Sequence, residues 1–337
     1  MRVRAISPTA MAGVLRLTSR RDLELAPTSP FHFDATMHKP DHFPSPDNAW
    51  APGVRWQTMR WRGEPLGLRV ADGGTRAHPR VLVRVWSRGR LPGEFMEGLA
   101  GELAWRWNLE LDLRGFNARF ASDPQIGPVL RRWRGMRPAS WSSLYEYLVI
   151  AIVLQNAVVH RSIQMMRALL ERYGTLLRYG GRELYGFWDP ADLDGVAEEE
   201  LRALKVGYRA RSIVRVTEAF ARGGLDEIAL RGRPEAEQRE ALLGLYGIGP
   251  ASAGYILSDV FHRLGPLTHI PPWEQRIYSM LFLGRDPGRP VPADRLLRIL
   301  NRRFGEHATL AVHYAWEDLF WRWRRGKAAW LDPLIRR

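Results

Sequence analysis

A glycine-containing turn between two helical segments is the part of the sequence best suited to holding a phosphate. Leu242–Leu257 reads LLGLYGIGPASAGYIL, and one helix is expected to end at Leu245 and the next to begin at Pro250. The two glycines allow close backbone approach, and Ile248 between them is expected to pack between the helices. The second helix would then present free N–H groups and its positive dipole end to an anion. The alternative is a plain helical hairpin with a glycine turn.

The composition of the 337-residue chain restricts the chemistry and indicates an anionic partner. Cysteine is absent, which excludes a disulfide, a thiol nucleophile, a zinc–thiolate site and an iron–sulfur cluster. Only three of the 50 basic residues are lysines (Lys39, Lys205 and Lys327), so a Schiff-base mechanism has three candidates. The net charge of +14, carried almost wholly by arginine, points to a polyanion, although codon bias or heat adaptation would also produce it.

The elements that must position the turn predict an α+β fold in two parts. The first part reads as β-rich with irregular connections, with strands expected over 55–62, 66–70 and 81–86 and helices over 94–107 and 125–133. From Ser142 helix follows helix, over 144–173 (one bent helix or two), 197–204, 211–222, 234–245, 251–264, 272–283, 293–304 and 308–325. We therefore expect an N-terminal β-rich domain over 1–135 packed on an all-α domain over 136–337.

Several segments, in order along the chain, resemble the helix-hairpin-helix DNA glycosylase superfamily of base-excision repair. LYGIGPASAGYILS (245–258) is similar to the family hairpin, with Tyr246 where proline is usual, and IVLQNAVVHRSIQMMRALLERYG (152–174) resembles the helix that carries a polar pair near the lesion strand. KVGYRARSI (205–213) is similar to a segment of 8-oxoguanine enzymes, and ATLAVHYAW (308–316) to the closing helix of alkyl-purine enzymes. The resemblance implies a glycosylase fold and a partner, double-stranded DNA with a damaged base.

The resemblance also implies which residues would contact that DNA. Phosphate and strand contacts fall to the hairpin and nearby arginines: Gly247, Ile248, Gly249, Ala251, Ser252, Arg209, Arg211 and Arg276. The carbonyl oxygens of Leu243, Leu245 and Ile248 match those that hold Na⁺ or K⁺ in the family, and no other cofactor is required. A flipped base would lie against Gln155, Asn156, Tyr208, Trp273 and Trp316. Each of these also has a plain structural role open to it, in the core or against neighbouring backbone.

The family's two catalytic residues, a lysine and an aspartate, are both replaced at the matching positions of this chain. Ala251 stands at the lysine that attacks the sugar in glycosylase/lyases, so lyase activity is not expected. Pro271 stands at the aspartate that stabilises the sugar cation. Glu274, in the first turn of the following helix, is the candidate substitute, with Asp259 and His269 as further candidates. Their structural alternatives are a carboxylate favoured at a helix N-terminus, an ion pair and a structural histidine.

The sequence leaves functions from different classes open. The first is a monofunctional DNA glycosylase that removes a damaged purine with water as nucleophile, with an alkylated base favoured and 8-oxoguanine or a deaminated base kept open. The alternative is a non-catalytic DNA-damage-binding protein on the same scaffold, and the third is an architectural duplex binder without a lesion pocket. The N-terminus, MRVRAISPTAMAGVLRL, lacks the sustained apolar core of a signal peptide, so a cytoplasmic location is expected. With DNA as the partner, we expect the protein to be nucleoid-associated, and we expect a monomer without membrane contact.

Overall fold

The computed structural model describes residues 13–41 and 44–335. Residues 1–12, on which much of the expectation about a signal peptide depends, lie outside the described residues. Within the described ranges, no helix is both long and apolar enough to cross a bilayer.

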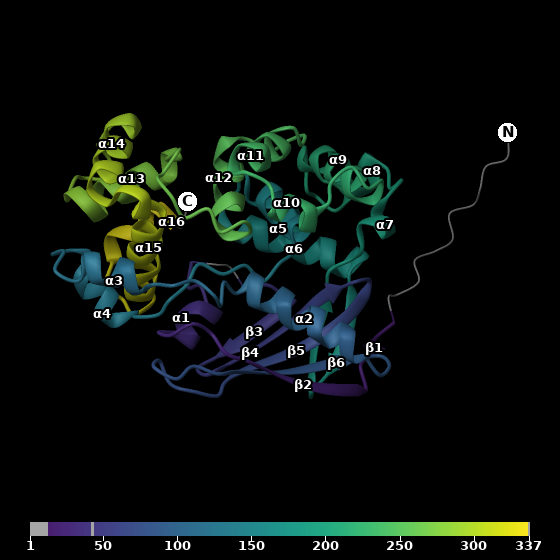
Figure 1. Cartoon of the computed structure of the whole chain (residues 1–337). Coiled ribbons are helices and arrows are strands. Elements are labelled where there is room, and N and C mark those ends of the chain that lie inside the picture. The colour runs from purple at the N-terminus through teal and green to yellow at the C-terminus, as the bar shows by residue number, and fades with distance from the viewer. Residues whose placement is uncertain (1–12, 42–43, 336–337) are drawn as a thin grey trace.

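A five-stranded antiparallel sheet underlies the two groups of helices (Figure 1). Its strands run in the order β2–β6–β5–β4–β3. Their bounds are β2 (Ser19–Leu25), β3 (Asn48–Ala51), β4 (Val54–Trp61), β5 (Glu64–Asp72) and β6 (Val81–Ser87). Alternation in β6 buries Val81, Val83 and Val85 against helix α2 (Gly93–Arg106), whose buried residues Leu99 and Leu103 belong to the same core. The three strands and the α2 helix expected from the sequence are confirmed.

The first group of helices contains the hairpin and has its own hydrophobic core. Its members are α5 (Leu144–Leu154), α6 (Val159–Tyr173), α7 (Pro190–Leu193), α8 (Glu198–Ala203), α9 (Arg209–Ala221), α10 (Glu227–Arg231), α11 (Glu235–Leu243) and α12 (Pro250–Asp259). The stretch expected over 144–173 is two helices, because the chain leaves the helical conformation at Gln155 and re-enters it after Val158. Helix α12 ends at Asp259, five residues earlier than expected, and His262 just beyond it has a left-handed φ of +57°.

The second group of helices is built from two distant parts of the chain. It comprises α3 (Arg114–Phe120), α4 (Ile126–Arg132), α13 (Pro272–Leu283), α14 (Ala293–Phe304), α15 (Ala308–Arg324) and α16 (Asp332–Ile335). One hydrophobic core joins residues 113–136 to the residues from Ile270 onward. This core therefore crosses position 135, where the texture of the sequence changes. In Figure 1 the first group lies above the sheet and the second stands at the left, with α3 and α4 beside the sheet.

The part of the chain expected to be entirely helical contains a β-hairpin, so that expectation is wrong there, although the α+β class is confirmed. Strands β7 (Thr175–Tyr179) and β8 (Arg182–Gly186) pair antiparallel, and β1 (Leu15–Arg16) adds to β7 in parallel. The connecting glycines 180 and 181 have φ of +54° and +77°, as a tight two-residue turn requires. The Gly180-Gly181 pair is the feature of the sequence that could have predicted this hairpin. A short helix, α1 (Phe33–Met37), also lies in the stretch expected to be irregular.

Candidate active site

The turn between α11 and α12 has the geometry that its sequence predicts. Gly249 caps α12 and Pro250 occupies the first helical position. Ile248 is only 6% exposed and packs in the core of the first helix group. Gly247 has a φ of +85°, and a Cβ at this position would clash with the Ser212 hydroxyl. The turn therefore requires glycine at 247, and it leaves the first N–H groups of α12 without helical partners, as at any helix N-terminus.

Replacing Gly247 by alanine is expected to destabilise the protein by about 2 kcal/mol, because the left-handed backbone and the Ser212 contact both oppose a methyl group. Gly254→Ala is the matched control, since a Cβ there meets nothing within 4 Å and alanine favours the interior of α12. Urea midpoints of the two variants measure the difference. An equal loss of stability in the two variants would show that the turn does not require glycine at position 247.

A depression of about 380 Å³ at the start of α12 gathers several of the residues expected at a phosphate. It is lined by Gln155, Gly247, Gly249, Pro250, Ala251, Ser252 and His269. Gln155 Nε2 donates to the Gly247 carbonyl at 2.7 Å, so the end of α5 is tied to the hairpin turn. His269, a catalytic candidate from the sequence, lies at this depression. It therefore lies at the hairpin and not at Glu274, the other catalytic candidate nearby in the sequence.

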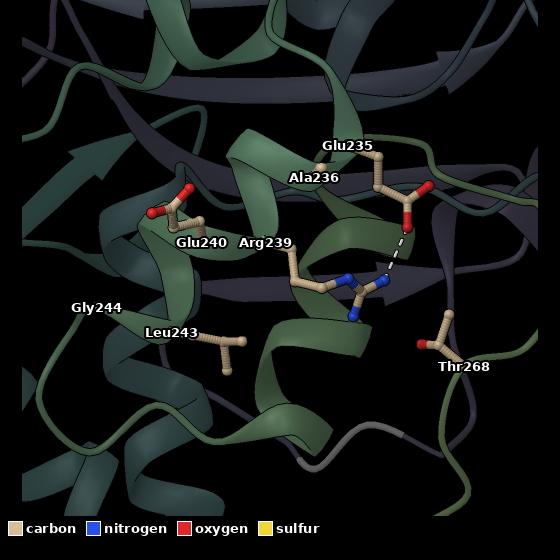
Figure 2. A pocket seen from close by; sticks show the side chains of 7 residues that line it. All are labelled: Glu235, Ala236, Arg239, Glu240, Leu243, Gly244 and Thr268. Atoms are coloured by element: carbon tan, nitrogen blue, oxygen red, sulfur yellow. Dashed lines mark hydrogen bonds and ion pairs between the residues drawn. The ribbon is translucent and has the colours of Figure 1, made fainter.

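A larger hollow of about 790 Å³ lies along α11 and has a different character. Figure 2 shows Arg239 turned toward Glu235, with Nη2 2.7 Å from Oε1, while Glu240 carries a second carboxylate on the same helix. One arginine against two carboxylates does not suit an anion. Of the two hollows, the depression at α12 is therefore the one whose lining suits an anion.

The loop before α9 places Tyr208 beside the turn between α5 and α6. Tyr208 is 53% exposed and its hydroxyl accepts a hydrogen bond from Asn156 Nδ2 at 3.2 Å. Asn156 has a φ of +48°, a conformation uncommon outside glycine. Arg209, expected at DNA, is only 8% exposed; it donates to the Gln155 carbonyl and lies over the Tyr208 ring. Arg209 is thus a positioning residue for this turn, because burial removes its guanidinium from the surface.

The other two expected arginines differ in exposure. Arg211 is exposed and its guanidinium lies 5.0 Å from the centre of the Tyr246 ring, next to the hairpin. Arg276 is half-buried and its Nε donates to the Pro287 carbonyl at 3.1 Å. Arg211 is therefore presented at the hairpin surface, whereas Arg276 is held by the loop after its own helix.

Five charged side chains from four places in the sequence meet between the two helix groups. We call them the carboxylate cluster: Lys39, Asp41, Asp259, Glu274 and Glu317. Glu274 in α13 is 7% exposed and accepts hydrogen bonds from the hydroxyls of Tyr255 and Tyr278. Burial raises the pKa of Glu274 above its usual value, and the two hydroxyls oppose this only in part. The carboxyl is held in one orientation beside Tyr255, which is itself 40% exposed.

Lys39, which is buried, and Asp259, which is 17% exposed, form an ion pair inside this cluster. Lys39 Nζ lies 3.4 Å from Asp259 Oδ2, and the Tyr147 hydroxyl donates to the same oxygen at 2.7 Å. Burial opposes the charge on Lys39, but Asp259, Glu317 and Asp41 outweigh it, so the pKa of the amine is raised. Asp259 thus has the ion-pair role that was its structural alternative. The pairing of Asp259 with Lys39 could not be predicted from the sequence, because 220 positions separate the two residues.

The two tryptophans expected at a base lie against this cluster. Trp273 is 39% exposed, and its Nε1 donates to the Leu334 carbonyl at 3.0 Å. Its ring stands edge-on to Trp316 with 5.2 Å between centroids. Trp316 Nε1 in turn donates to Asp41 Oδ2 at 2.8 Å. The expected base-pocket residues therefore divide into two sets, these tryptophans at the cluster and Gln155, Asn156 and Tyr208 beside the hairpin.

Comparison with known proteins gives the same fold. No protein-family model matches the chain. Over 269 residues it is 25% identical to a Methanothermobacter thermautotrophicus protein named probable N-glycosylase/DNA lyase, which covers 74% of this chain and 80% of the relative. The 3-methyladenine DNA glycosylase of Archaeoglobus fulgidus matches with a TM-score of 0.70 at 18% identity, over 88% of this chain and 99% of that one. The Clostridium acetobutylicum 8-oxoguanine glycosylase/lyase, in complex with double-stranded DNA, matches with a TM-score of 0.65 at 15% identity. The match covers 92% of this chain and 99% of that one. The chain thus has the fold of the helix-hairpin-helix DNA glycosylases, and the resemblance to that superfamily expected from its sequence is confirmed.

Proposed function

We propose that this protein is a monofunctional DNA glycosylase that removes a damaged purine, with alkylated bases favoured. The observation that carries the proposal is Glu274, a carboxylate buried behind exposed aromatic rings close to the chain's phosphate-binding hairpin. The names of similar proteins support the glycosylase part of this proposal, since the Archaeoglobus fulgidus structure is a 3-methyladenine DNA glycosylase and the other two proteins are named as glycosylase/lyases.

Glu274 can supply the electrostatic help that the reaction needs. Breaking the bond between base and sugar builds positive charge on the sugar, and a fixed negative charge in a site with little water stabilises it. Glu274 lies three residues beyond Pro271, in the first turn of α13, and two tyrosine hydroxyls hold its carboxylate. With the charge so stabilised, water attacks C1′ from solvent.

Two observations support hydrolysis without a lyase step. Ala251 lines the hairpin depression at the position of the family's lysine and offers no amine. Lys39 lies in the carboxylate cluster, but its raised pKa and its pairing with Asp259 keep it protonated. A protonated amine is not a nucleophile.

The hairpin is suited to a monovalent cation as well as to a phosphate. Across residues 13–41 and 44–335, no backbone N–H donates to the carbonyl oxygens of Leu243 or Ile248, whereas the Leu245 carbonyl accepts the N–H of Ile248 at 3.1 Å. Carbonyl oxygens are the ligands that hard cations prefer. Leu243 and Ile248, with the second lone pair of the Leu245 oxygen, would hold Na⁺ or K⁺ and add positive charge beside the phosphate.

A screen of lesion-containing duplexes tests the proposal. The protein is incubated with duplexes carrying 3-methyladenine, 7-methylguanine, hypoxanthine, uracil or 8-oxoguanine, and abasic sites are then cleaved with hot alkali. We expect release of an alkylated purine and strand breaks only after alkali. Breaks without alkali would contradict the monofunctional assignment. Tight binding to an abasic-site analogue without release of any base would instead identify the alternative, a non-catalytic damage-binding protein.

A further inference from the structure

Two short segments rich in arginine and tryptophan have no part in the mechanism above. They are RRWR (131–134), at the end of α4, and RWRR (322–325), at the end of α15. The structure brings them together, because α4 and α15 lie side by side (Figure 1). Arg132 and Arg322 both pair with Asp318, which is only 3% exposed and also accepts the indole N–H of Trp133 at 2.7 Å. We call the resulting basic patch the arginine surface: Arg131, Arg132, Arg134, Arg322, Arg324, Arg325 and Lys327.

Most of the charge on the arginine surface is not neutralised by the protein. Five of its members are exposed and form no ion pair with any residue in the described part of the chain: Arg131, Arg134, Arg324, Arg325 and Lys327. On other helices an exposed arginine stands one turn from a carboxylate, as Arg167 does from Glu171. Heat adaptation adds ion pairs of that kind. It therefore does not account for a group of cations without carboxylates.

Tryptophan rings pack beneath these cations. Trp133 stacks on Trp321 with 5.4 Å between the ring centroids, and the Arg325 guanidinium lies 5.7 Å from the centre of the Trp321 ring. Trp133 is 6% exposed, so it belongs to the core and offers no free face to a base. The charged ends of the side chains remain in contact with solvent. The arginine surface is thus suited to a chain of phosphates and not to stacked bases.

The arginine surface borders the carboxylate cluster and is separate from the hairpin. Arg324 Nε donates to the Pro40 carbonyl at 2.9 Å, and Pro40 stands between Lys39 and Asp41, two members of the cluster. Lys39 pairs with Asp259 at the end of α12, whereas the hairpin turn lies at the start of that helix. The ten residues of α12 place about 15 Å between these two ends.

We propose that the arginine surface binds the phosphate backbone of double-stranded DNA at a second place, away from the hairpin; the proposal rests on DNA as the partner in the function above. A DNA duplex carries one negative charge per roughly 1.7 Å of its axis, a density that matches closely spaced cations. Contacts to phosphates carry no sequence information. The arginine surface would therefore raise the affinity for any duplex and leave the choice of base to the residues around Glu274.

A triple variant that removes unpaired cations tests the arginine surface. Arg134→Gln, Arg325→Gln and Lys327→Gln are combined, because the described structure shows no side-chain hydrogen bond or ion pair for any of the three. The urea midpoint should therefore stay unchanged. The dissociation constant is measured for an undamaged duplex of about 25 base pairs at several salt concentrations. We expect the slope of log K against log salt concentration to become shallower by about two to three, and the affinity at about 0.1 M salt to fall at least tenfold.

Two control variants separate phosphate contacts from a general effect of net charge. Arg167→Gln, Arg172→Gln and Arg202→Gln together remove the same charge from arginines that have carboxylate partners, and affinity should stay within about threefold of wild type. Arg134→Lys combined with Arg325→Lys should keep the wild-type slope, since lysine also binds phosphate as a point charge.

The outcomes distinguish the arginine surface from the glycosylase function. An unchanged slope in the first triple variant, or equal losses in the two triple variants, would overturn the arginine surface. So would a loss in the lysine variant as large as in the glutamine variant, because the contact would then not be with phosphates. If the slopes change as expected but the wild-type protein releases no base from any lesion duplex, the arginine surface stands and the glycosylase function fails. A wild-type protein that binds no duplex would contradict both.

Discussion

Replacing Glu274 by glutamine is expected to lower the rate of base release by about 10²- to 10³-fold, as the removal of one preorganised charge-stabilising group does in other enzymes. The substitution removes the negative charge while keeping an oxygen that can accept from Tyr255 and Tyr278. The fold and the hairpin should therefore persist. Single-turnover release of 7-methylguanine measures the effect, and binding to an abasic-site duplex, expected to stay within about threefold, shows that the hairpin is intact.

The control for Glu274 is Glu240→Gln, a carboxylate in the hollow along α11 that faces no tyrosine hydroxyl in the described structure. It should leave the rate unchanged. Since burial raises the pKa of Glu274 above 4.5 and the charged form is the active one, the rate should also fall on acidification, at a pH above that ordinary value. An unchanged rate in Glu274→Gln would show that Glu274 has no catalytic role and only stabilises the N-terminus of α13.

Lys39→Met is expected to cost about 3–5 kcal/mol of unfolding free energy, because it leaves a buried charge without its partner. Methionine keeps the length and apolar stem of lysine, so packing changes little. Asp259 would retain the Tyr147 hydroxyl but would lose the lysine that offsets its negative charge. The urea midpoint measures the loss. Since the pKa of Lys39 is raised in the folded protein, its contribution is complete below the unfolded pKa of about 10.5 and disappears only as the pH rises through the folded pKa.

An exposed ion pair and a double substitution serve as controls for the stability loss expected in Lys39→Met. Arg84 and Asp22 pair at 2.8 Å on the exposed face of the sheet, and Arg84→Gln should shift the urea midpoint far less than Lys39→Met does, because solvent screens this pair. Lys39→Met combined with Asp259→Asn removes both charges and should recover part of the stability. If the double variant is no more stable than Lys39→Met alone, the ion pair is not the reason for the loss.

The parts of the site that were predictable from the sequence depend on residues near one another in the chain. The hairpin could be recognised because its glycines, Ile248 and Pro250 occupy four successive positions and their constraints are local. Gln155 could be identified as a polar residue in an apolar helix, but not its bond to the Gly247 carbonyl, which spans 92 positions. Local patterns specify the turn and leave its tertiary partners open.

The carboxylate cluster could not be predicted because its members come together only through the packing of the helix groups. Lys39 stands in a proline-rich stretch with no periodicity, and no spacing relates it to Asp259. Glu317 precedes Asp318 on an otherwise aromatic helix, where a charged pair is typical of a solvated face; both side chains are buried. Only the folded structure shows that Glu317 faces Lys39, Asp41 and Asp259.

The ion pair between Lys39 and Asp259 has a consequence for how the molecule acquires its activity. The hairpin consists of near-neighbour contacts and is expected to form early, whereas the base site needs the N-terminal segment to dock onto helices made some 220 positions later. Under the proposed glycosylase function, a newly made or partly unfolded chain would bind duplex DNA before its base site is complete. Hydrogen exchange that protects the backbone of α12 before that of the segment around Lys39 would reveal this order of assembly.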